Sequence, residues 1–282
     1  MNKIQGCALL ITVVIILLVN IIYGLKPGKK RFKEGDTKVV NIDDKGIIPK
    51  NIFKTGIDDY NKINKDLFSL FSKTIDENPD FEIEYYSDKG SREFVKNNFS
   101  KRVLDTYDKL IPGAYKADLF RYCILYKRGG IYSDLSQNFL LPLEDFIDFE
   151  NDNLVLVKDR NLRNIIGDNI GESVEGIQIS FMASRPNNYI YLNAINEIIK
   201  NCENKYYGGT AMSPTGPQLF QKMVNNYDGE YRIDLYFNGT YIIDKNTNKH
   251  FILNRLKNHY NMILKNKKHY FYLWMNKNIY KD

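Results

Sequence analysis

The sequence predicts an α/β domain over residues 47–282, built on an open, mostly parallel central sheet with helices on both faces. Short apolar or alternating runs, typical of strands, take turns with longer segments that repeat apolar residues every three or four positions, typical of amphipathic helices. No internal repeat interrupts this order. The composition, with 43% apolar and 26% charged residues among 282, is that of a folded globular protein and excludes wholesale disorder.

The expected elements follow one another closely along the chain. The run FEIEYY at 81–86 alternates as a strand does, and a helix over 114–128 would place Leu119, Tyr122 and Tyr126 on one face and end at a Gly-Gly pair. Strands are expected at residues 47–53, 81–86, 131–134, 154–157 and 177–183, and helices at 58–75, 92–99, 101–110, 114–128, 189–201 and 216–225. In open sheets of this class, ligands bind beyond the carboxyl ends of the strands.

An apolar segment precedes the domain. After a short tail of residues 1–6, residues 7–25 read CALLITVVIILLVNIIYGL, which is close to the length that crosses a bilayer as a helix. A cleaved signal peptide is the alternative, but the run is long for one and no small-residue cleavage site follows it. We therefore expect a single-pass transmembrane signal-anchor, followed by a basic stem or linker over residues 26–46.

The charges that flank this segment bear on its orientation. Lys3 precedes the span, whereas five basic residues follow it within residues 26–33. The positive-inside rule, read literally, places the large C-terminal domain in the cytoplasm.

Charge is distributed unevenly over the chain. There are 40 Lys and Arg against 34 Asp and Glu, a net charge of +6, but residues 26–38 carry +4 and residues 245–281 carry +9, which leaves −7 on residues 39–244. An acidic body argues against a nucleic-acid partner, and single-strand binding by the basic, aromatic C-terminal segment is the least favoured function. Three Cys and three His, scattered along the chain, exclude a disulfide framework and a zinc cluster.

Residues 114–146 hold the densest group of polar residues among apolar ones. Asp118 and Arg121 lie three apart on one helix face, close enough to pair or to bind one ligand together. The next strand delivers Asp134 to its carboxyl end, and Ser136 follows. Oxygen groups at a strand end suit a hard cation that bridges a diphosphate. Each residue taken singly fits a structural role, but the order and spacing of the whole set favour a binding site.

This segment resembles the glycosyltransferase family that shares the DXD sugar-binding region, which includes Golgi α-1,6-mannosyltransferases, capsular polysaccharide transferases and, more distantly, bacterial glucosylating toxins. The family pattern R/S-A-D-x-x-R-Y-x-x-L-x-x-x-G-G-x-Y-x-D-x-D is matched in register from Ala117 to Asp134. Five further segments resemble family motifs in the same order: IPKNIFKTG at 48–56, NPDFEIEYYSD at 78–88, FMASRPNNYIY at 181–191, SPTGP at 213–217 and HYFYLW at 269–274. The resemblance therefore covers residues 47–282.

The resemblance implies a GT-A fold and transfer of a hexosyl residue from a nucleotide-sugar, with retention at the anomeric carbon and with a divalent metal, usually Mn²⁺. The expected acceptor is a glycan, glycoprotein or glycolipid. Family analogy also implies a place in the lumen of the Golgi or endoplasmic reticulum, which is opposite to the literal reading of the flanking charges. The orientation therefore stays open.

The resemblance also assigns roles by position. Catalytic roles fall to Asp118 and Arg121, which would hold the donor sugar and its phosphates, and to Asp134. Nucleotide-sugar binding is implied for Ile52, Phe53, Asp118, Arg121, Tyr132, Asp134 and Trp274, and metal binding for Asp134, Ser136 and His269. The basic, aromatic C-terminal segment would close over the diphosphate as a lid, because the departing diphosphate needs positive charge; a solvated tail is the alternative.

The metal site departs from the family pattern. Ser136 replaces the second Asp of DXD, so a carboxylate ligand becomes a hydroxyl. The affinity for metal should fall unless Gln137, Asn138, His269 or the diphosphate compensates. For this reason a degenerate member that binds nucleotide-sugar or glycan without turnover is the alternative to an active, membrane-anchored glycosyltransferase.

The nucleotide site departs from the pattern as well. Phe53 replaces a His of the family motif, and Gly56 replaces a Trp that can lie near the nucleotide base. A UDP-sugar and a GDP-sugar are both open as the donor. Acceptor contacts are expected from the loops at 159–176 and 203–213.

Overall fold

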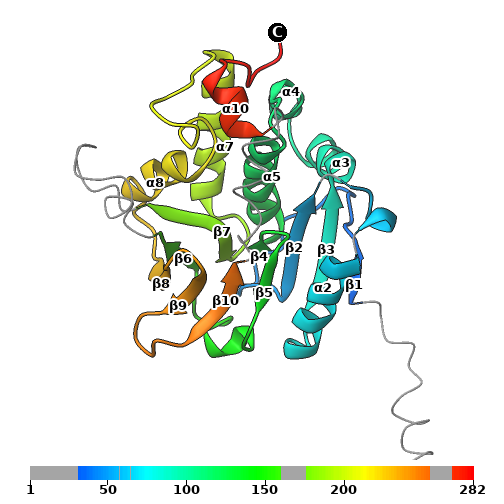
Figure 1. Ribbon diagram of the computed structural model, residues 1–282, viewed down its shortest axis with the longest axis vertical. Helices are drawn as coiled ribbons and strands as arrows, with labels where there is room; N and C mark the ends of the chain where they lie inside the picture. The colour runs from blue at the N-terminus through cyan, green and yellow to red at the C-terminus, as the bar shows by residue number, and fades with distance from the viewer. Residues whose placement is uncertain (1–30, 57, 64, 160–175, 255–268) are drawn as a thin grey trace, which may run out of the picture. The chain divides into compact units, whose positions relative to one another are not determined.

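A computed structural model describes residues 31–56, 58–63, 65–159, 176–254 and 269–282. Within them, ten strands form one sheet in the order β1-β3-β2-β4-β7-β6-β8-β9-β10-β5 (Figure 1). The strands are β1 (Phe32–Glu34), β2 (Asn51–Gly56), β3 (Glu82–Ser87), β4 (Gly130–Ser133), β5 (Gln137–Phe139), β6 (Leu154–Lys158), β7 (Ile177–Ser184), β8 (Arg232–Phe237), β9 (Tyr241–Asp244) and β10 (His250–Asn254). The helices are α2 (Lys65–Glu77), α3 (Asp88–Asn98), α4 (Lys101–Lys109), α5 (Gly113–Arg128), α7 (Tyr189–Glu203), α8 (Pro217–Asn225) and α10 (Tyr270–Met275), with short 3-10 turns at Tyr60–Lys62 and Leu143–Asp145.

The sheet is mixed, which corrects the prediction of a mostly parallel one. β1, β3, β2 and β4 run parallel to one another and β6 runs parallel to β8, whereas the remaining neighbours pair antiparallel. Much of the antiparallel half comes from β5, β8, β9 and β10, none of which was expected from the sequence. The β8 sequence RIDLYF does alternate apolar with polar residues, so this strand carries the usual periodicity.

Part of the predicted linker, residues 26–46, is folded onto the sheet. β1 pairs with β3, the Gly35 N–H donates to the Tyr85 carbonyl at 2.8 Å, and the Val40 N–H donates to Asn98 Oδ1 at 2.7 Å. The Phe32 side chain is buried in the core. The folded domain therefore includes residues from 32 onward rather than from 47. Adding a short strand to a sheet edge requires backbone hydrogen bonds but little apolar periodicity, which is why the sequence pattern misses it.

Several predicted features fall outside the described residues: the tail 1–6, the span 7–25, most of the acceptor loop 159–176 and residues 255–268 of the basic C-terminal segment. In the part of the chain that the structure describes, no helix combines the length and the apolar character needed to cross a membrane.

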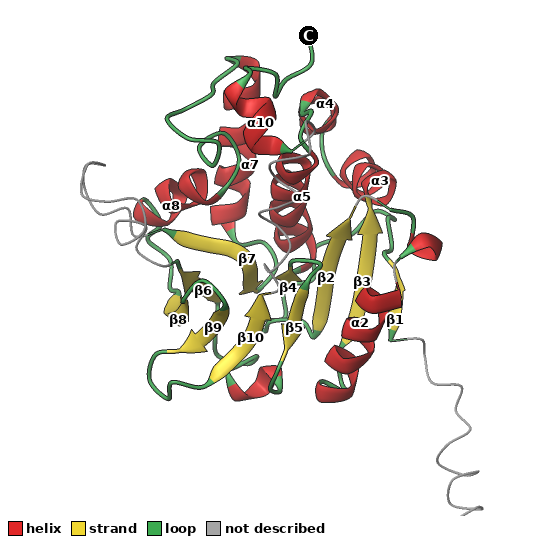
Figure 2. Cartoon of the chain, in the orientation of Figure 1, coloured by secondary structure: helices red, strands yellow, loops and turns green. Residues whose placement is uncertain are grey.

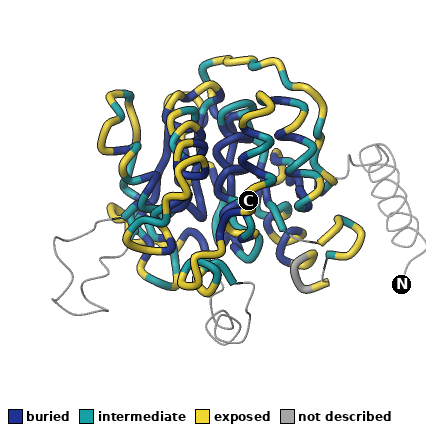
Figure 3. Tube along the Cα trace, turned by 90° about the horizontal axis from the view of Figure 1, so that it is seen from above, coloured by how far each residue is buried: buried dark blue, intermediate teal, exposed yellow. Residues whose placement is uncertain are grey.

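Each central strand contributes to two cores, because successive side chains point to opposite faces of the sheet. Phe53 and Tyr132 pack into a core with α3, α4, α5, α7 and α8, whereas Ile52 and Ile131 pack into a second core with α2, β5 and β10. Figure 2 shows α2 in front of the sheet, and Figure 3 shows buried residues in the interior and exposed residues at the periphery. The prediction of helices on both faces is therefore confirmed.

Candidate active site

Helix α5 and the turn after β4 bring three charged residues together. Arg121 Nη2 lies 3.1 Å from Asp118 Oδ1, and Arg121 Nη1 lies 3.5 Å from Asp134 Oδ1. The chain turns sharply from α5 into β4 at Gly129, which has a φ of 60°. A Cβ there would come within 2.5 Å of the Pro186 nitrogen, so glycine is needed. Asp134 directly follows β4, which places the cluster at the carboxyl end of that strand.

The Arg121 guanidinium is held firmly in place. It donates to the Ile179 carbonyl at 2.6 Å and lies 4.4 Å from the centre of the Tyr132 ring. Burial alone would lower the pKa of Arg121, but Tyr132 and the two carboxylates raise it above its ordinary value. Arg121 is therefore a permanent, preorganised positive charge, and Tyr132 is the ring that supports it.

The two carboxylates beside Arg121 differ in exposure. Asp118 is only 7% exposed and accepts a hydrogen bond from the Thr215 hydroxyl at 2.7 Å. Burial raises the pKa of Asp118 to about 6, although Arg121 and Thr215 oppose the change. The Asp134 side chain, in contrast, is 40% exposed. Asp134 is thus accessible to a ligand, while Asp118 is anchored by the loop that contains the SPTGP segment.

Lys54, on β2, is a charged residue that the sequence analysis did not single out. It is fully buried, and its ammonium donates to Ser133 Oγ at 3.0 Å and to the Asp134 carbonyl at 3.1 Å. The ammonium also lies 5.6 Å from the ring centres of both Phe71 and Phe139. Burial lowers the pKa of Lys54 to about 7, and the Asp134 charge opposes this only in part. A lysine directly after the predicted apolar strand at 47–53 is the sequence feature that could have revealed it.

A hydrogen-bonded network supports the turn that carries Asp134 and Ser136. The Ser133 hydroxyl donates to Gln137 Oε1 at 2.8 Å, and the Gln137 amide donates to the Ser180 hydroxyl at 2.9 Å. The Asp134 N–H donates to the Ser180 carbonyl at 2.8 Å. Gln137 is therefore engaged in the support of the turn, which leaves it a poor substitute for the missing carboxylate ligand.

Ile52 and Phe53, two of the residues predicted to bind the nucleotide, lie in the cores, as does Tyr132, which is 1% exposed. The side chains of Ile52 and Phe53 are both 0% exposed, and Phe53 lies beneath the Arg128 guanidinium at 4.9 Å. A side chain with no exposed surface does not contact a bound nucleotide. We therefore assign both residues a packing role on β2, where they stand in register with Ile131 and Tyr132 of β4.

The C-terminal residues fold back beside α5. His269 caps α10 by accepting the Phe271 N–H at Nδ1, 3.2 Å away, and Trp274 Nε1 donates to the Tyr207 carbonyl at 2.7 Å. The Tyr270 ring lies 6.1 Å from that of Tyr115 on α5. These contacts place α10 near the start of α5, while metal binding by His269 and diphosphate covering by Trp274 remain predictions.

The donor groups near the turn are oxygen atoms, which suit a hard divalent cation. Asp134 offers a carboxylate and Ser136 a hydroxyl, and the buried Asn138 Oδ1 has no hydrogen-bond partner among the described residues. Over the same residues, no group of three or more His, Cys, Asp and Glu side chains is placed to hold a metal. A metal bound here would therefore depend on further oxygen ligands from a diphosphate.

Comparison with known proteins agrees with this arrangement. Residues 65–153, which contain Asp118, Arg121, Tyr132, Asp134 and Ser136, match a family model described as "Glycosyltransferase sugar-binding region containing DXD motif". This stretch is similar to the sugar-binding region of that glycosyltransferase family. The match confirms, over residues 65–153, the resemblance inferred from the sequence motifs.

Relatives of the chain are themselves named glycosyltransferases. An uncharacterized glycosyltransferase of Acanthamoeba polyphaga mimivirus is 29% identical over 186 residues, covering 64% of this chain and 66% of that protein. An initiation-specific alpha-1,6-mannosyltransferase of Candida albicans is 26% identical over 206 residues, covering 64% of this chain and 53% of that protein. The chain therefore spans less than two thirds of the length of either relative. The solved structure "PaToxG Glycosyltransferase" matches with a TM-score of 0.48 and 16% identity, covering 64% of this chain and 69% of that one.

Proposed function

We propose that this chain is a GT-A glycosyltransferase that transfers a hexosyl residue from a nucleotide-sugar to a glycan, glycoprotein or glycolipid acceptor, with retention of configuration and with the help of a divalent metal. The observation that carries the proposal is the placement of the Arg121 guanidinium between Asp118 and the exposed Asp134. A diphosphate needs positive charge, and a sugar needs carboxylates that accept its hydroxyl groups. This cluster offers both at the end of one strand.

Electrostatic stabilisation is the catalytic device in this proposal. Negative charge develops on the diphosphate as the glycosidic bond breaks, and Arg121 is held in advance to stabilise it. Asp118, buried against Arg121, would accept hydrogen bonds from the donor sugar. Asp134 and Ser136 would hold the metal, which would supply Lewis-acid stabilisation of the negative charge on the diphosphate. We assign no enzyme base or nucleophile.

We further propose that residues 7–25 anchor the protein in a membrane of the Golgi or endoplasmic reticulum. The length of the apolar run and the family resemblance support the anchor. The family resemblance implies a lumenal C-terminal domain, whereas the basic residues after the run favour a cytoplasmic one. Protease treatment of sealed microsomes distinguishes the two orientations, since a lumenal C-terminal domain is protected until detergent is added.

The proposed activity is tested with the full chain, purified in detergent and incubated with a panel of UDP- and GDP-sugars and Mn²⁺, with and without EDTA. Release of nucleoside diphosphate is measured. We expect turnover of one donor, loss of that turnover with EDTA, and a fall of about 100-fold or more in Asp134→Asn. Asp105→Asn, an exposed carboxylate of α4 paired with Lys101, is the matched control and should retain activity. Full activity in Asp134→Asn would contradict the proposal.

A binding-only protein is the second candidate, and Ser136 favours it because the chain offers one carboxylate where the family pattern has two. Ser136→Asp discriminates between the two functions. If the wild-type chain binds a nucleotide-sugar without turning it over and the variant gains metal-dependent turnover, the chain is a degenerate member. If the wild type is already active, the degenerate interpretation is wrong.

A further inference from the structure

A pocket of about 210 Å³ lies at the carboxyl ends of the parallel strands β2 and β3. Its walls come from the end of β2, the first residue after β3, the end of α4 and the start of α5, and include Gly56, Asp88, Tyr107, Lys116 and Ala117. Ala117 directly precedes Asp118 in α5. A donor whose diphosphate lies at Arg121 would therefore have its nucleoside within reach of this pocket.

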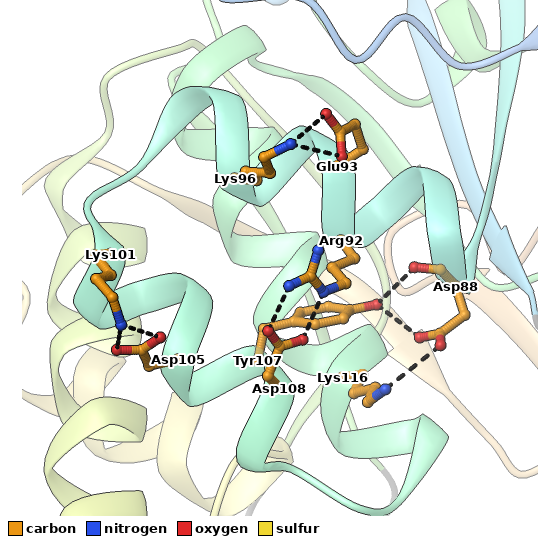
Figure 4. Close-up of polar contacts among 9 residues, drawn as sticks. All are labelled: Asp88, Arg92, Glu93, Lys96, Lys101, Asp105, Tyr107, Asp108 and Lys116. Atoms are coloured by element: carbon orange, nitrogen blue, oxygen red, sulfur yellow. Dashed lines mark hydrogen bonds and ion pairs between the residues drawn. The ribbon is translucent and has the colours of Figure 1, made fainter.

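A carboxylate and an ammonium stand side by side in the pocket wall (Figure 4). Lys116 Nζ lies 3.4 Å from Asp88 Oδ2, and the Tyr107 hydroxyl donates to Asp88 Oδ1 at 2.8 Å. Lys116 Nζ also lies 5.2 Å from the centre of the Tyr107 ring. Burial and the Asp88 charge raise the pKa of Tyr107, so its hydroxyl remains a donor that orients the carboxylate.

Asp88 retains capacity for a ligand. Its side chain is 48% exposed, and a carboxylate offers about four lone-pair positions. Tyr107 and Lys116 occupy one position on each oxygen. The remaining lone pairs can accept two parallel N–H groups from a molecule in the pocket.

Gly56 explains why recognition of the base falls to these residues. A Cβ at Gly56 would lie 2.6 Å from the Tyr85 hydroxyl, so an aromatic side chain does not fit at this position without rearrangement. The Tyr85 hydroxyl is held by the Asp58 carbonyl at 2.7 Å. The pocket therefore lacks a stacking ring from β2, and its polar wall becomes the selective feature.

We propose that Asp88 and Lys116 read the base of the donor nucleotide and select guanine, so that the donor is a GDP-sugar; this inference rests on the proposed function. Guanine presents the O6 acceptor next to two N–H donors, which match an ammonium next to a carboxylate. Uracil presents one N–H between two carbonyl oxygens, so one of its carbonyls faces the carboxylate. Bidentate pairing with a carboxylate thus favours guanine and disfavours uracil.

The test measures binding of GDP, UDP and inosine diphosphate to the full chain with Mn²⁺ by titration calorimetry. Inosine diphosphate is GDP without the exocyclic amino group, so it isolates the second N–H donor. We expect GDP to bind at least about tenfold more tightly than either other ligand. In Asp88→Asn, GDP affinity should fall about tenfold or more, while UDP affinity changes little.

Asp108→Asn is the matched control, because Asp108 lies in the same helix pair but bonds to Arg92 at 2.7 Å, outside the pocket lining (Figure 4). It should leave all three affinities unchanged. The inference is overturned if the wild type prefers UDP, if inosine diphosphate equals GDP, or if Asp88→Asn weakens GDP and UDP equally while its circular dichroism stays native. Failure of the wild type to bind any nucleotide would instead overturn the proposed function and this inference with it.

Discussion

Arg121 and Arg128 project from the same helix, seven residues and about two turns apart, and each faces a carboxylate brought by a neighbouring strand or turn. Arg128 meets Glu84 of β3, whereas Arg121 meets Asp118 of its own helix and Asp134 after β4. Both guanidiniums are largely buried. The two clusters nevertheless differ in how completely their polar groups are satisfied.

At Arg128 the pairing is closed. Its Nη1 and Nη2 reach the two Glu84 carboxylate oxygens at 2.6 and 2.8 Å, and the Tyr86 hydroxyl lies 3.0 Å from the same Nη1. Burial alone would raise the pKa of Glu84, but Arg128 and Lys33 lower it below its ordinary value. The fully buried Glu84 side chain leaves no exposed oxygen for a ligand.

At Arg121 the pairing is open. Its separate contacts with Asp118 and Asp134, at 3.1 and 3.5 Å, do not form a bidentate pair, and the Asp134 side chain remains 40% exposed. The pKa of Asp118 is raised to about 6 by burial, which is the opposite of the shift at Glu84. A closed pair stabilises the fold, whereas an open cluster keeps its electrostatic capacity for a ligand. Because of this difference we assign a structural role to Arg128 and propose a functional one for Arg121.

The largest expected effect is on the closed pair. Glu84→Gln leaves Arg128 buried without its charged partner, so the free energy of unfolding should fall by about 3–5 kcal/mol. Urea denaturation measures this change. The activity of molecules that remain folded should match wild type, and a specific loss of turnover would show that this pair also serves the active site.

At the open cluster, a substitution should lower catalytic activity rather than stability. Arg121→Met removes the charge that stabilises the departing diphosphate, and kcat should fall about 100- to 1,000-fold. Arg121→Lys should recover only part of this loss, because lysine lacks the planar fork that contacts two groups at once. Steady-state kinetics with the preferred donor measures both variants. Activity of Arg121→Met near the wild-type level would remove Arg121 from the catalytic assignment.

Lys54 extends the comparison to a buried charge with no carboxylate within ion-pair distance in the described part of the chain. Its pKa falls from 10.5 to about 7, so between these values the unfolded chain binds a proton that the folded protein lacks, and stability rises with pH. Lys54→Met removes this dependence. Between pH 7 and pH 9, the unfolding free energy of the wild type should therefore rise by about 2 kcal/mol relative to that of Lys54→Met.

Lys101→Met is the control for that measurement, because the Lys101 side chain is 84% exposed. It should show no comparable shift over the same pH range. A flat difference for Lys54→Met would mean that the Lys54 ammonium keeps its proton throughout this range despite its burial.

The sequence predicts all three residues of the open cluster and neither residue of the closed pair. Asp118, Arg121 and Asp134 follow from spacing within one helix and one strand, and the family pattern names them. Glu84 and Arg128 are 44 residues apart, and only the register of β3 beside β2 and the packing of α5 bring them together. Local periodicity contains no such information, so a structural ion pair of this kind is invisible before the fold is known.

The same reasoning explains the errors in the predicted site and fold. Ile52 and Phe53 stand in a family motif, but strand alternation directs one side chain into each core, where both are buried. Lys54, the next residue, has a side chain long enough to reach from β2 to the turn after β4. β1 is held by backbone hydrogen bonds, which leave little trace in side-chain patterns.

The smallest expected effect compares the two carboxylates directly. The pKa of Asp118 rises from 3.8 to about 6 on folding, so between these values the folded protein holds a proton that the unfolded chain has released, and stability falls as pH rises. Glu84, with a lowered pKa, contributes stability that is lost as pH falls through its folded pKa. Between pH 4 and pH 6, the free energy of unfolding of Asp118→Asn should therefore rise by about 1–2 kcal/mol relative to that of the wild type. Chemical denaturation measures this change. A variant that loses stability over that range would mean that Arg121 holds Asp118 as Arg128 holds Glu84, and the distinction between an open and a closed arginine would fail.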